Sequence, residues 1–588
     1  MTGKIHSFNW TKNPFYTAGV LFLIAFLFRV YHLSQIPMMN DELSALYRLQ
    51  VNDFTTLITQ GVIPDGHPAF TQIFLYYYTK FFGFSSGIIK LPFIFFGALS
   101  VAVAYLYFSD FINKQTGFMV AALMLSGQFF IMHSQTARPY AFALFFMLIA
   151  AYTWNLYGKK QLIKYFWFTV FIGLLIASTH YLAFLAFVFL IILSPLVYPS
   201  IRLKHAVYLF GLILLFYSSQ FFIFYKHFAV GGVGTWLGKP NYTFIYSFLE
   251  YVSNYSSLLL FILFVGIFAG LVFIFISPID KKLIYLLSVF MLTFCVEFFY
   301  SIFRNPILQF PSLLFAIPFG LAFMVNAFSN VRYGLLFPVL LFAFQTYALL
   351  IQRNHYTNFY KQGYLASTQA ILTNTTSNTP LLLNGNQQYY FDYYFKNKDY
   401  IPNYVSTRID SISVEHFSEL VSSIQSDTIV VAHAFFLSPL YFETARLYFP
   451  KVIYHEQHLF NETMVLSKED ISKEKDFSNV KLSSKLKSFL IKPHEILRFT
   501  AVSNDSSNIG FTLYLLNLKD EIIAESISIQ LIGTKQYQIA CIETPPKNYS
   551  QVVKIEASYM SQIGSKLPIN IKCEKGNGLL FSSILPLP

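Results

Sequence analysis

The sequence predicts a polytopic α-helical membrane protein with a water-soluble region after its last membrane helix. Of the 588 residues, 55% are hydrophobic and only 12% are charged, which is unlike a soluble protein. Apolar stretches of membrane-spanning length recur up to about residue 352. Residues 353–588 lack such stretches and have the composition of a soluble region.

Apolar stretches long enough to cross a bilayer define the first part of the chain. We expect about eleven spans, at about residues 14–33, 88–108, 117–134, 139–157, 165–181, 182–199, 206–225, 257–277, 283–301, 310–328 and 333–352. Basic residues in short connections mark the cytoplasmic side. They occur at Lys4, Lys12, Lys114, Lys159, Lys160, Lys164, Arg202, Lys204, Lys281, Lys282 and Arg332. With eleven spans, all of them lie inside and residues 353–588 lie outside.

This topology also explains the net charge of +12, so the charge does not indicate nucleic-acid binding. The three cysteines show no metal-site spacing. Cys295 lies in an apolar stretch and is expected to be a packing residue. Cys541 and Cys573 lie in the soluble region, where they could pair if that region is extracytoplasmic. The sequence leaves this pairing open.

Residues 34–87 are expected to form one long outer loop. The apolar segment 68–84 cannot be a full span, because every later basic loop would then change sides. It is rich in aromatic residues, which favour the membrane–water interface, so we expect a helix lying on the outer surface. In 42–60, apolar residues recur at helical spacing, which predicts an amphipathic interfacial helix.

Two adjacent carboxylates, Asp41 and Glu42, lie in this outer loop just after the first span. Charges at the edge of the bilayer are costly and often functional. A carboxylate there could take a proton from an acceptor hydroxyl or amine, or it could hold a divalent cation against a phosphate. Acidic residues also stabilise the start of a helix, and this structural role is compatible with the chemical one.

Other polar residues are expected at the outer ends of the spans. Together with the acidic pair, they are Asp65, His67, His133, Gln135, Arg138, Tyr140, His180, Tyr181, Lys226, His227, Lys239 and Arg304. Three of these places have a structural alternative: a turn at His67–Pro68, headgroup contact for Arg138, and interfacial packing for His180–Tyr181. Such convergence on one face of an apolar bundle nevertheless indicates a site better than any single residue does. The Gly-rich segment 231–234 is expected to be a mobile loop nearby.

An ordered set of short motifs resembles the GT-C superfamily of membrane glycosyltransferases. The similarity is to the branch shared by protein O-mannosyltransferases, aminoarabinose transferases and bacterial family 39 proteins. The matching motifs are Asp41–Glu42, His67–Pro68–Ala69, the segment 134–140 with its Arg-x-Tyr, and His180–Tyr181. Their order and spacing match over about residues 14–350.

The resemblance implies transfer of a sugar from a polyprenyl-phosphate carrier to an acceptor on the extracytoplasmic face, with inversion. The family's first-loop acid corresponds to Asp41, with Glu42 beside it, and these are the expected catalytic residues. The expected substrate-binding residues are His67, Gln135, Arg138, Tyr140, His180, Tyr181, Lys226 and Arg304. The partners would be the lipid-linked sugar, membrane lipids and an acceptor that is a lipid, a protein or a polysaccharide. The location would be a bacterial inner membrane.

Three departures from the family pattern weaken parts of this assignment. Thr136 stands where many relatives carry an acid two residues before the arginine, so we expect no tightly bound metal ion, although a divalent cation stays an option. Ala69 replaces the second proline of His-Pro-Pro. Near residue 310, Pro311–Ser312 stand where relatives have Arg-Tyr, so Gln309 and Arg304 would have to substitute.

The chain also allows two other function classes: a transporter or flippase for lipid-linked sugars, and a membrane-anchored glycan-binding protein. Inverted repeats and broken helices, which are typical of transporters, are not evident in the sequence. A glycine-rich phosphate loop after a strand is also not evident, so a nucleotide donor is not indicated.

The soluble region is expected to form two extracytoplasmic domains. In 353–475, strands near 381–386 and 428–433 and a helix near 442–448 predict a small α/β domain. In 476–588, short strand-like segments with turn signals predict a β-sandwich. Both domains could shape acceptor access or bind glycan, or they could be passive.

Overall fold

The computed structural model describes residues 13–468 apart from 231–236, 277–279, 330–335, 397–399, 436 and 459, and then the strands between 478 and 577. The described chain forms two compact units. The first unit consists of the chain up to Ile36 together with Asp41–Tyr356. The second unit consists of Pro37–Asn40 together with the chain from Thr357 onward. The expected inside markers Lys4, Lys12 and Arg332, and the segment 231–234, lie outside the described residues.

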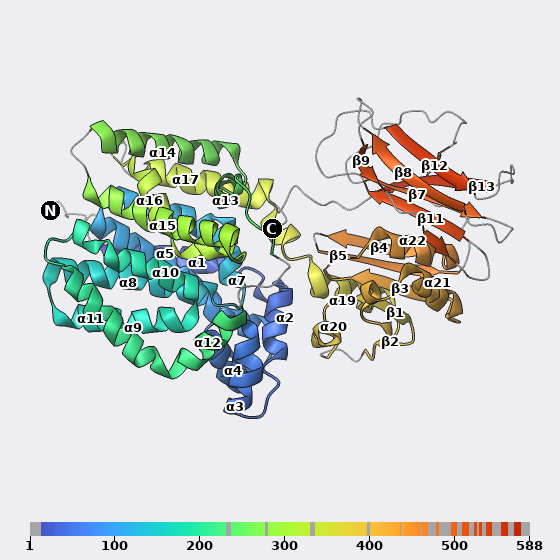
Figure 1. The fold of residues 1–588 in the computed structure, drawn as a ribbon, viewed down its shortest axis with the longest axis horizontal. Coiled ribbons are helices and arrows are strands. Elements are labelled where there is room, and N and C mark those ends of the chain that lie inside the picture. The colour runs from blue at the N-terminus through green and yellow to red at the C-terminus, as the bar shows by residue number, and fades with distance from the viewer. Residues whose placement is uncertain are drawn as a thin grey trace, which may run out of the picture. The chain divides into compact units, whose positions relative to one another are not determined.

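The first unit is a bundle of apolar helices, coloured from blue to yellow in Figure 1. The helical stretches long and apolar enough to cross a membrane are α5 (Ser86–Phe111), α8 (Tyr140–Lys160), α11 (Leu203–Tyr217) continued by α12 (Phe221–Val230), α14 (Ser257–Ile276) and α15 (Lys281–Phe303). The bent pair α6 (Lys114–Ser126) and α7 (Gln128–Gln135) makes a sixth candidate. Shorter apolar helices are α1 (Pro14–Val30), α9 (Ile163–Thr179), α10 (Tyr181–Ile192), α16 (Ile317–Asn326) and α17 (Leu336–Tyr347).

Each of the eleven predicted apolar segments therefore contains a helix over most of its described residues, although in the described part of the chain only five of these stretches, or six with the bent pair, are long and apolar enough to cross a membrane. Large apolar side chains such as Phe171, Leu215 and Phe268 are exposed on the outward faces of these helices. A bundle that is apolar outside as well as inside is a membrane bundle, because such a surface in water would be strongly unfavourable. The chain is an integral membrane protein of polytopic α-helical architecture.

The 59° bend between α6 and α7 occurs at Gly127, where the helix stops and restarts. A helix end leaves backbone carbonyls without partners, and these must be satisfied inside a bundle. Arg29, which is fully buried, donates to the carbonyl oxygens of Met124 (2.9 Å) and Leu125 (3.1 Å). This guanidinium therefore stabilises the bend, which sets the direction of α7.

The outer loop folds as several short elements, which lie at one end of the bundle in Figure 1. They are α2 (Asn40–Tyr47), α3 (Phe54–Thr56), the π-helical turn η2 (Leu57–Val62), the 3-10 turn η3 (Ile63–Asp65) and α4 (Ala69–Phe82). Helix α4 lies where a helix over 68–84 was predicted. Its position at the membrane surface stays a prediction.

The prediction of one helix over 42–60 is wrong, because α2 ends at Tyr47 and a new helix begins after Asp53. The Asp53 carboxylate accepts a hydrogen bond from the Thr56 backbone N–H at 2.9 Å. An aspartate in this capping position favours a helix start over a continuous helix, so the local signal outweighs the apolar spacing.

The second unit contains a mixed five-stranded sheet with the order β2-β1-β3-β5-β4. Strands β1 (Pro380–Asn384), β2 (Asn403–Ser406) and β3 (Thr428–His433) are parallel, and β4 (Lys451–His458) and β5 (Asn461–Ser467) form an antiparallel pair. The helices with these strands are α19 (Gly363–Asn374), α20 (Gln388–Phe395), α21 (Val414–Ser423) and α22 (Pro439–Tyr448). Crossover helices between parallel strands are the expected pattern of an α/β fold.

Two antiparallel sheets follow. One has the order β10-β11-β7-β13-β6 and the other β12-β8-β9. Their strands are β6 (Ser478–Val480), β7 (Glu495–Val502), β8 (Ile509–Leu516), β9 (Ile522–Glu525), β10 (Ile529–Leu531), β11 (Tyr537–Glu543), β12 (Lys554–Ser561) and β13 (Asn570–Asn577).

The register of these strands bears on the open cysteine question. Cys541 on β11 pairs with Arg498 of β7, and Cys573 on β13 pairs with Phe499 of the same strand. Strand β7 therefore separates the two cysteines by two interstrand spacings, about 9–10 Å. Disulfides require Cα atoms within about 7 Å, and whether the two cysteines pair stays open.

We predict that Gly97→Val destabilises the bundle by about 1–3 kcal/mol, because overpacked cores lose roughly this much. A Cβ at Gly97 of α5 would overlap the side chain of Ser134 in α7. Gly19→Val is the matched control, since a Cβ there meets nothing within 4 Å. Thermal unfolding of both purified variants in detergent tests this, and equal melting temperatures would contradict it.

Candidate functional site

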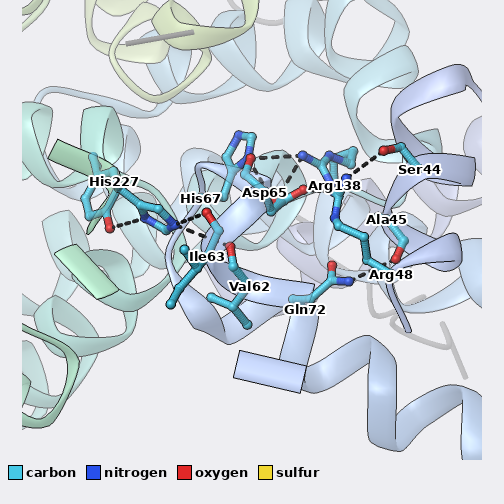
Figure 2. Close-up of polar contacts among 11 residues, drawn as sticks. Ser44, Ala45, Arg48, Val62, Ile63, Asp65, His67, Gln72, Arg138 and His227 are labelled. Atoms are coloured by element: carbon cyan, nitrogen blue, oxygen red, sulfur yellow. Dashed lines mark hydrogen bonds and ion pairs between the residues drawn. The ribbon is translucent and has the colours of Figure 1, made fainter. Parts of the chain in front are cut away.

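A cluster of charged side chains surrounds Asp65 in the outer loop (Figure 2). Arg138 donates to both carboxylate oxygens of Asp65, from Nη1 to Oδ1 at 2.9 Å and from Nη2 to Oδ2 at 3.2 Å. Arg48 also forms an ion pair with Oδ1, and His67 Nδ1 lies 3.1 Å from Oδ2. We call Arg48, Asp65, His67 and Arg138 the Asp65 cluster.

The members of the cluster come from three parts of the first unit. Asp65 ends η3, and Gly66 follows with φ +75°, a conformation that favours glycine and turns the chain towards His67. Arg48 follows α2, and its Nη1 donates to Ser44 Oγ at 2.6 Å, one helical turn back. Arg138 lies between α7 and α8. The cluster therefore joins the outer loop to the start of a membrane helix.

The Asp65–Arg138 pair at the centre of the cluster is buried, Arg48 and His67 are half-buried, and the cluster carries an excess of positive charge. The side chains of Asp65 and Arg138 are only 5% and 7% exposed. Burial by itself would raise the pKa of Asp65, but Arg138, His67 and Arg48 outweigh it and hold that pKa well below its ordinary value. Two guanidinium groups against one carboxylate leave one positive charge when His67 is neutral. Among the described residues, Arg138 Nε has no hydrogen-bond partner, so a donor stays available.

Asp41 is the accessible carboxylate near this cluster. It lies in the first turn of α2 and is exposed. It interacts electrostatically with Arg138 and Tyr140. Burial would lower the pKa of Arg138, but the carboxylates of Asp65 and Asp41 raise it above its ordinary value. Both expected roles of Asp41 are compatible with this position, since an acid in the first turn also stabilises the helix.

Glu42 has a very different environment from its neighbour Asp41. Its side chain is fully buried and pairs with Lys90 of α5 at 2.5 Å. The Glu42 oxygen in this pair, Oε1, also accepts a hydrogen bond from the Ala137 backbone N–H at 2.6 Å. Lys90 also donates to the Gln135 carbonyl oxygen at 2.7 Å. The contacts of Glu42 are those of a buried ion pair, and its expected catalytic role stays a prediction.

A layer of rings lies beside the cluster. The His180 ring is 5.5 Å from that of His67, 6.1 Å from Tyr140 and 4.7 Å from Phe315. The Tyr140 ring also contacts His133 at 5.2 Å. His180 Nδ1 accepts a hydrogen bond from Leu182 N, so the other ring nitrogen, Nε2, carries the proton of a neutral imidazole. The structure thus brings His180 and Tyr140 to the site, as expected for substrate-binding residues.

Tyr181 and Gln135 make other contacts. The Tyr181 hydroxyl lies 2.8 Å from His227 Nδ1. His227 Nε2 reaches the carbonyl oxygens of Val62 and Ile63, at 3.3 and 3.1 Å, which ties α12 to the outer loop (Figure 2). Gln135 is fully buried and donates to the Arg29 carbonyl oxygen at 2.9 Å. These side chains support the loop and the end of α7.

Lys226 and Arg304 are both exposed. Lys226 lies over the Phe222 ring at 5.4 Å. Over the described part of the chain, neither residue forms a hydrogen bond or ion pair with the Asp65 cluster. Their expected roles as phosphate contacts stay predictions.

Two charged residues of this region escaped the sequence reasoning. Lys90 is a lone cation near the start of an apolar span, and this signal by itself indicates a buried partner or a site. Arg48 follows Asp41 by seven residues, which places the two on one helical face. The position two residues before Arg138 is Thr136, and the carboxylate beside Arg138 comes instead from Asp65 of the outer loop.

The carboxylates do not form a metal site in the described residues, where no group of three or more His, Cys, Asp or Glu side chains could hold an ion. Asp65 is already neutralised by two guanidinium groups. A divalent cation there would have to displace them, so these residues do not fit a resident metal.

Comparisons with known proteins give structural likenesses only. No family model matches the chain, and no curated protein matches it. ArnT from Cupriavidus metallidurans, in a crystal structure with bound undecaprenyl phosphate, is similar with a TM-score of 0.45 at 11% identity, covering 76% of this chain and 96% of that one. Apo ArnT gives a TM-score of 0.37 at 10% identity, covering 76% and 98% of the two chains. Arabinosyltransferase EmbB from Mycobacterium smegmatis gives 0.35 at 9% identity, covering 96% of this chain and 64% of that one. Likenesses at these values do not establish function.

We predict that Asp65→Asn lowers the stability of the protein at neutral pH by about 3–5 kcal/mol, the usual loss when one partner of a buried pair is removed. Because the folded-state pKa of Asp65 is depressed, its contribution is complete above the unfolded value near 3.8 and is lost as the pH falls below it. The difference in the free energy of unfolding between wild type and Asp65→Asn should be constant from pH 8 to about 5 and should become smaller below about pH 4.

Thermal unfolding in detergent across this pH range measures this difference. The control is Asp53→Asn, which changes an exposed carboxylate of the same loop and keeps a capping side chain. A difference for Asp65→Asn that becomes larger on acidification would contradict the assigned ionisation state.

Proposed function

We propose that the chain is a membrane glycosyltransferase that moves a sugar from a polyprenyl-phosphate carrier to an acceptor at the extracytoplasmic face. The observation that carries this proposal is an exposed carboxylate, Asp41, beside a cluster with an excess positive charge. A lipid-linked sugar phosphate offers both an anion for the cluster and an electrophilic carbon for an activated acceptor. The ordered motifs that resemble the GT-C superfamily support the same function.

The position of the cluster along α8 supports an extracytoplasmic site. Arg138 precedes the first residue of this 21-residue helix, and Lys159 and Lys160 end it. A helix of this length spans about 30 Å, the thickness of the hydrocarbon core. Since basic loops favour the cytoplasm, the Arg138 end would lie at the opposite face. In this proposal, the membrane is a bacterial inner membrane and the domains 353–475 and 476–588 are extracytoplasmic.

The proposed reaction is a single displacement. Asp41 takes the proton of the acceptor hydroxyl or amine as that atom forms a bond to the anomeric carbon. The bond between this carbon and the phosphate oxygen breaks, and the electron pair leaves with the polyprenyl phosphate. Attack from the side opposite the phosphate inverts the anomeric configuration. Arg138 and Arg48 would stabilise the charge on the departing phosphate.

A donor screen tests this function directly. The purified protein is incubated with labelled polyprenyl-phosphate sugars and candidate acceptors, and free carrier phosphate is followed. We expect release that depends on acceptor with at least one donor. Binding of the lipid without release, together with movement of the intact lipid across vesicle membranes, would instead favour the flippase alternative.

We predict that Asp41→Asn lowers turnover by about 10²–10⁴-fold, the usual contribution of a general base, with donor affinity largely kept. The matched control is Asp53→Asn, which makes the same chemical change in the same loop and should retain wild-type turnover. Transfer at the wild-type rate by Asp41→Asn, with the protein folded, would remove Asp41 from the catalytic role.

We predict that Arg138→Lys raises the KM for the lipid donor by about tenfold or more, equivalent to about 1.4 kcal/mol. A lysine keeps the charge but cannot make the two parallel hydrogen bonds to Asp65 that hold the Arg138 guanidinium in place. Steady-state kinetics with varied donor measure this effect. A KM that increases for the acceptor and not for the donor would place the lipid phosphate elsewhere.

A further inference from the structure

We propose that Lys90 and Glu42 are positioning residues, and that their buried ion pair fixes the candidate base Asp41 relative to the candidate phosphate anchor Arg138. This inference rests on the proposed function. It assigns to Glu42 a role different from that of Asp41, although the two acids are adjacent. It also assigns a role to Lys90, a cation in a membrane helix that the proposed chemistry does not use.

The contacts of the pair connect both functional residues. Glu42 Oε1 accepts hydrogen bonds from Lys90 Nζ at 2.5 Å and from the Ala137 backbone N–H at 2.6 Å. Glu42 directly follows Asp41, and Ala137 directly precedes Arg138. A single carboxylate oxygen therefore joins the residue next to the base with the residue next to the anchor.

Lys90 attaches this junction to the membrane bundle. Besides Glu42, its ammonium group donates to the carbonyl oxygen of Gln135 at 2.7 Å. Gln135 is the last residue of α7, where a cation is favoured by the helix dipole. Lys90 thus connects α5, the first turn of α2 and the segment that leads from α7 to α8.

Helices α5 and α7, which Lys90 connects, each have a further hydrogen bond to another helix. Pro92 lacks an N–H, so the carbonyl of Ile88 has no partner within α5, and the Tyr78 hydroxyl of α4 donates to it at 3.1 Å. On the other side, Ser134 Oγ accepts from Arg29 Nε at 3.1 Å, and the Gln135 side chain donates to the Arg29 carbonyl. The ion pair therefore lies between α5 and α7, each of which has a further hydrogen bond to a neighbouring helix.

The burial of the pair favours a positioning role over a purely stabilising one. Lys90 and Glu42 are 1% and 0% exposed at their side chains. Two charges this deeply buried lose their hydration, and such pairs are often no more stabilising than apolar residues of similar volume. Their hydrogen-bond geometry, by contrast, restricts the direction of α2. Since transfer needs the reacting atoms within about 3–3.5 Å, a small shift of α2 would slow the chemical step.

The test is the double variant Glu42→Gln/Lys90→Met. It removes both charges, leaves no unpaired ion and keeps an oxygen for the Ala137 N–H. We expect a melting temperature close to that of wild type, a kcat lower by at least tenfold, and a donor KM within about threefold, because Arg138 keeps its contacts with Asp65. The single variant Lys90→Arg keeps the positive charge and can still donate to both Glu42 and the Gln135 carbonyl oxygen. Its turnover should therefore be close to that of wild type and well above that of the double variant.

The matched control is Asp110→Asn/Lys159→Met. It neutralises another ion pair between α5 and α8, with an Nζ–Oδ2 distance of 2.9 Å, twenty residues further along α5. This control should keep wild-type kcat. A double variant Glu42→Gln/Lys90→Met that melts like wild type and turns over within twofold of it would overturn the proposal.

A second measurement does not depend on transfer activity. Spin labels at Gln50→Cys, after α2, and Leu91→Cys, on α5, are introduced with Cys295, Cys541 and Cys573 replaced by serine. Both labelled positions are exposed. We expect a narrow distance distribution that broadens or shifts when the pair is removed. An unchanged distribution would overturn the positioning role, whereas a broadened one without any glycosyl transfer by wild type would overturn only the proposed function.

Discussion

Buried charges in an apolar bundle require partners, and this constraint organises the end of the bundle that carries α2 and α4. Lys90 is paired with Glu42, Asp65 with two arginines, and Arg29 with the carbonyls released at the end of α6. Each pairing joins elements that are distant in the sequence. Unpaired, any of these ions would cost several kcal/mol in such surroundings. The pairings therefore hold the outer loop against the membrane helices in a defined arrangement.

Asp41 differs from these residues because it is exposed while its neighbours are neutralised. A carboxylate that lies near a cation and is still accessible to substrate can take a proton from that substrate. The Asp65 cluster provides the complementary property, a buried positive charge with a free donor at Arg138 Nε among the described residues. In the proposed mechanism, Asp41 and Glu42 have different roles because the first is exposed and the second is buried.

Much of the fold follows from the sequence, because apolar segments of membrane length leave few alternatives to helices. The outer loop was harder to predict. The apolar spacing of 42–60 suggested one helix, but the capping side chain of Asp53 started a second one. The convergence of Arg138, His67, His180 and Tyr140 was expected from the sequence, whereas their roles in substrate binding stay predictions. The Lys90–Glu42 pair and the Arg48–Asp65 pair could not be derived, since both depend on how α2, η3 and α5 pack together.

The most direct measurement of the central claim is an experimental structure of Asp41→Asn with an intact polyprenyl-phosphate sugar bound. The variant should bind the donor without consuming it. We expect a phosphate oxygen about 2.7–2.9 Å from a guanidinium nitrogen of Arg138 or Arg48, the usual length of such bonds, with the anomeric carbon facing residue 41. A phosphate bound at the opposite end of α8, beside Lys159 and Lys160, would contradict it.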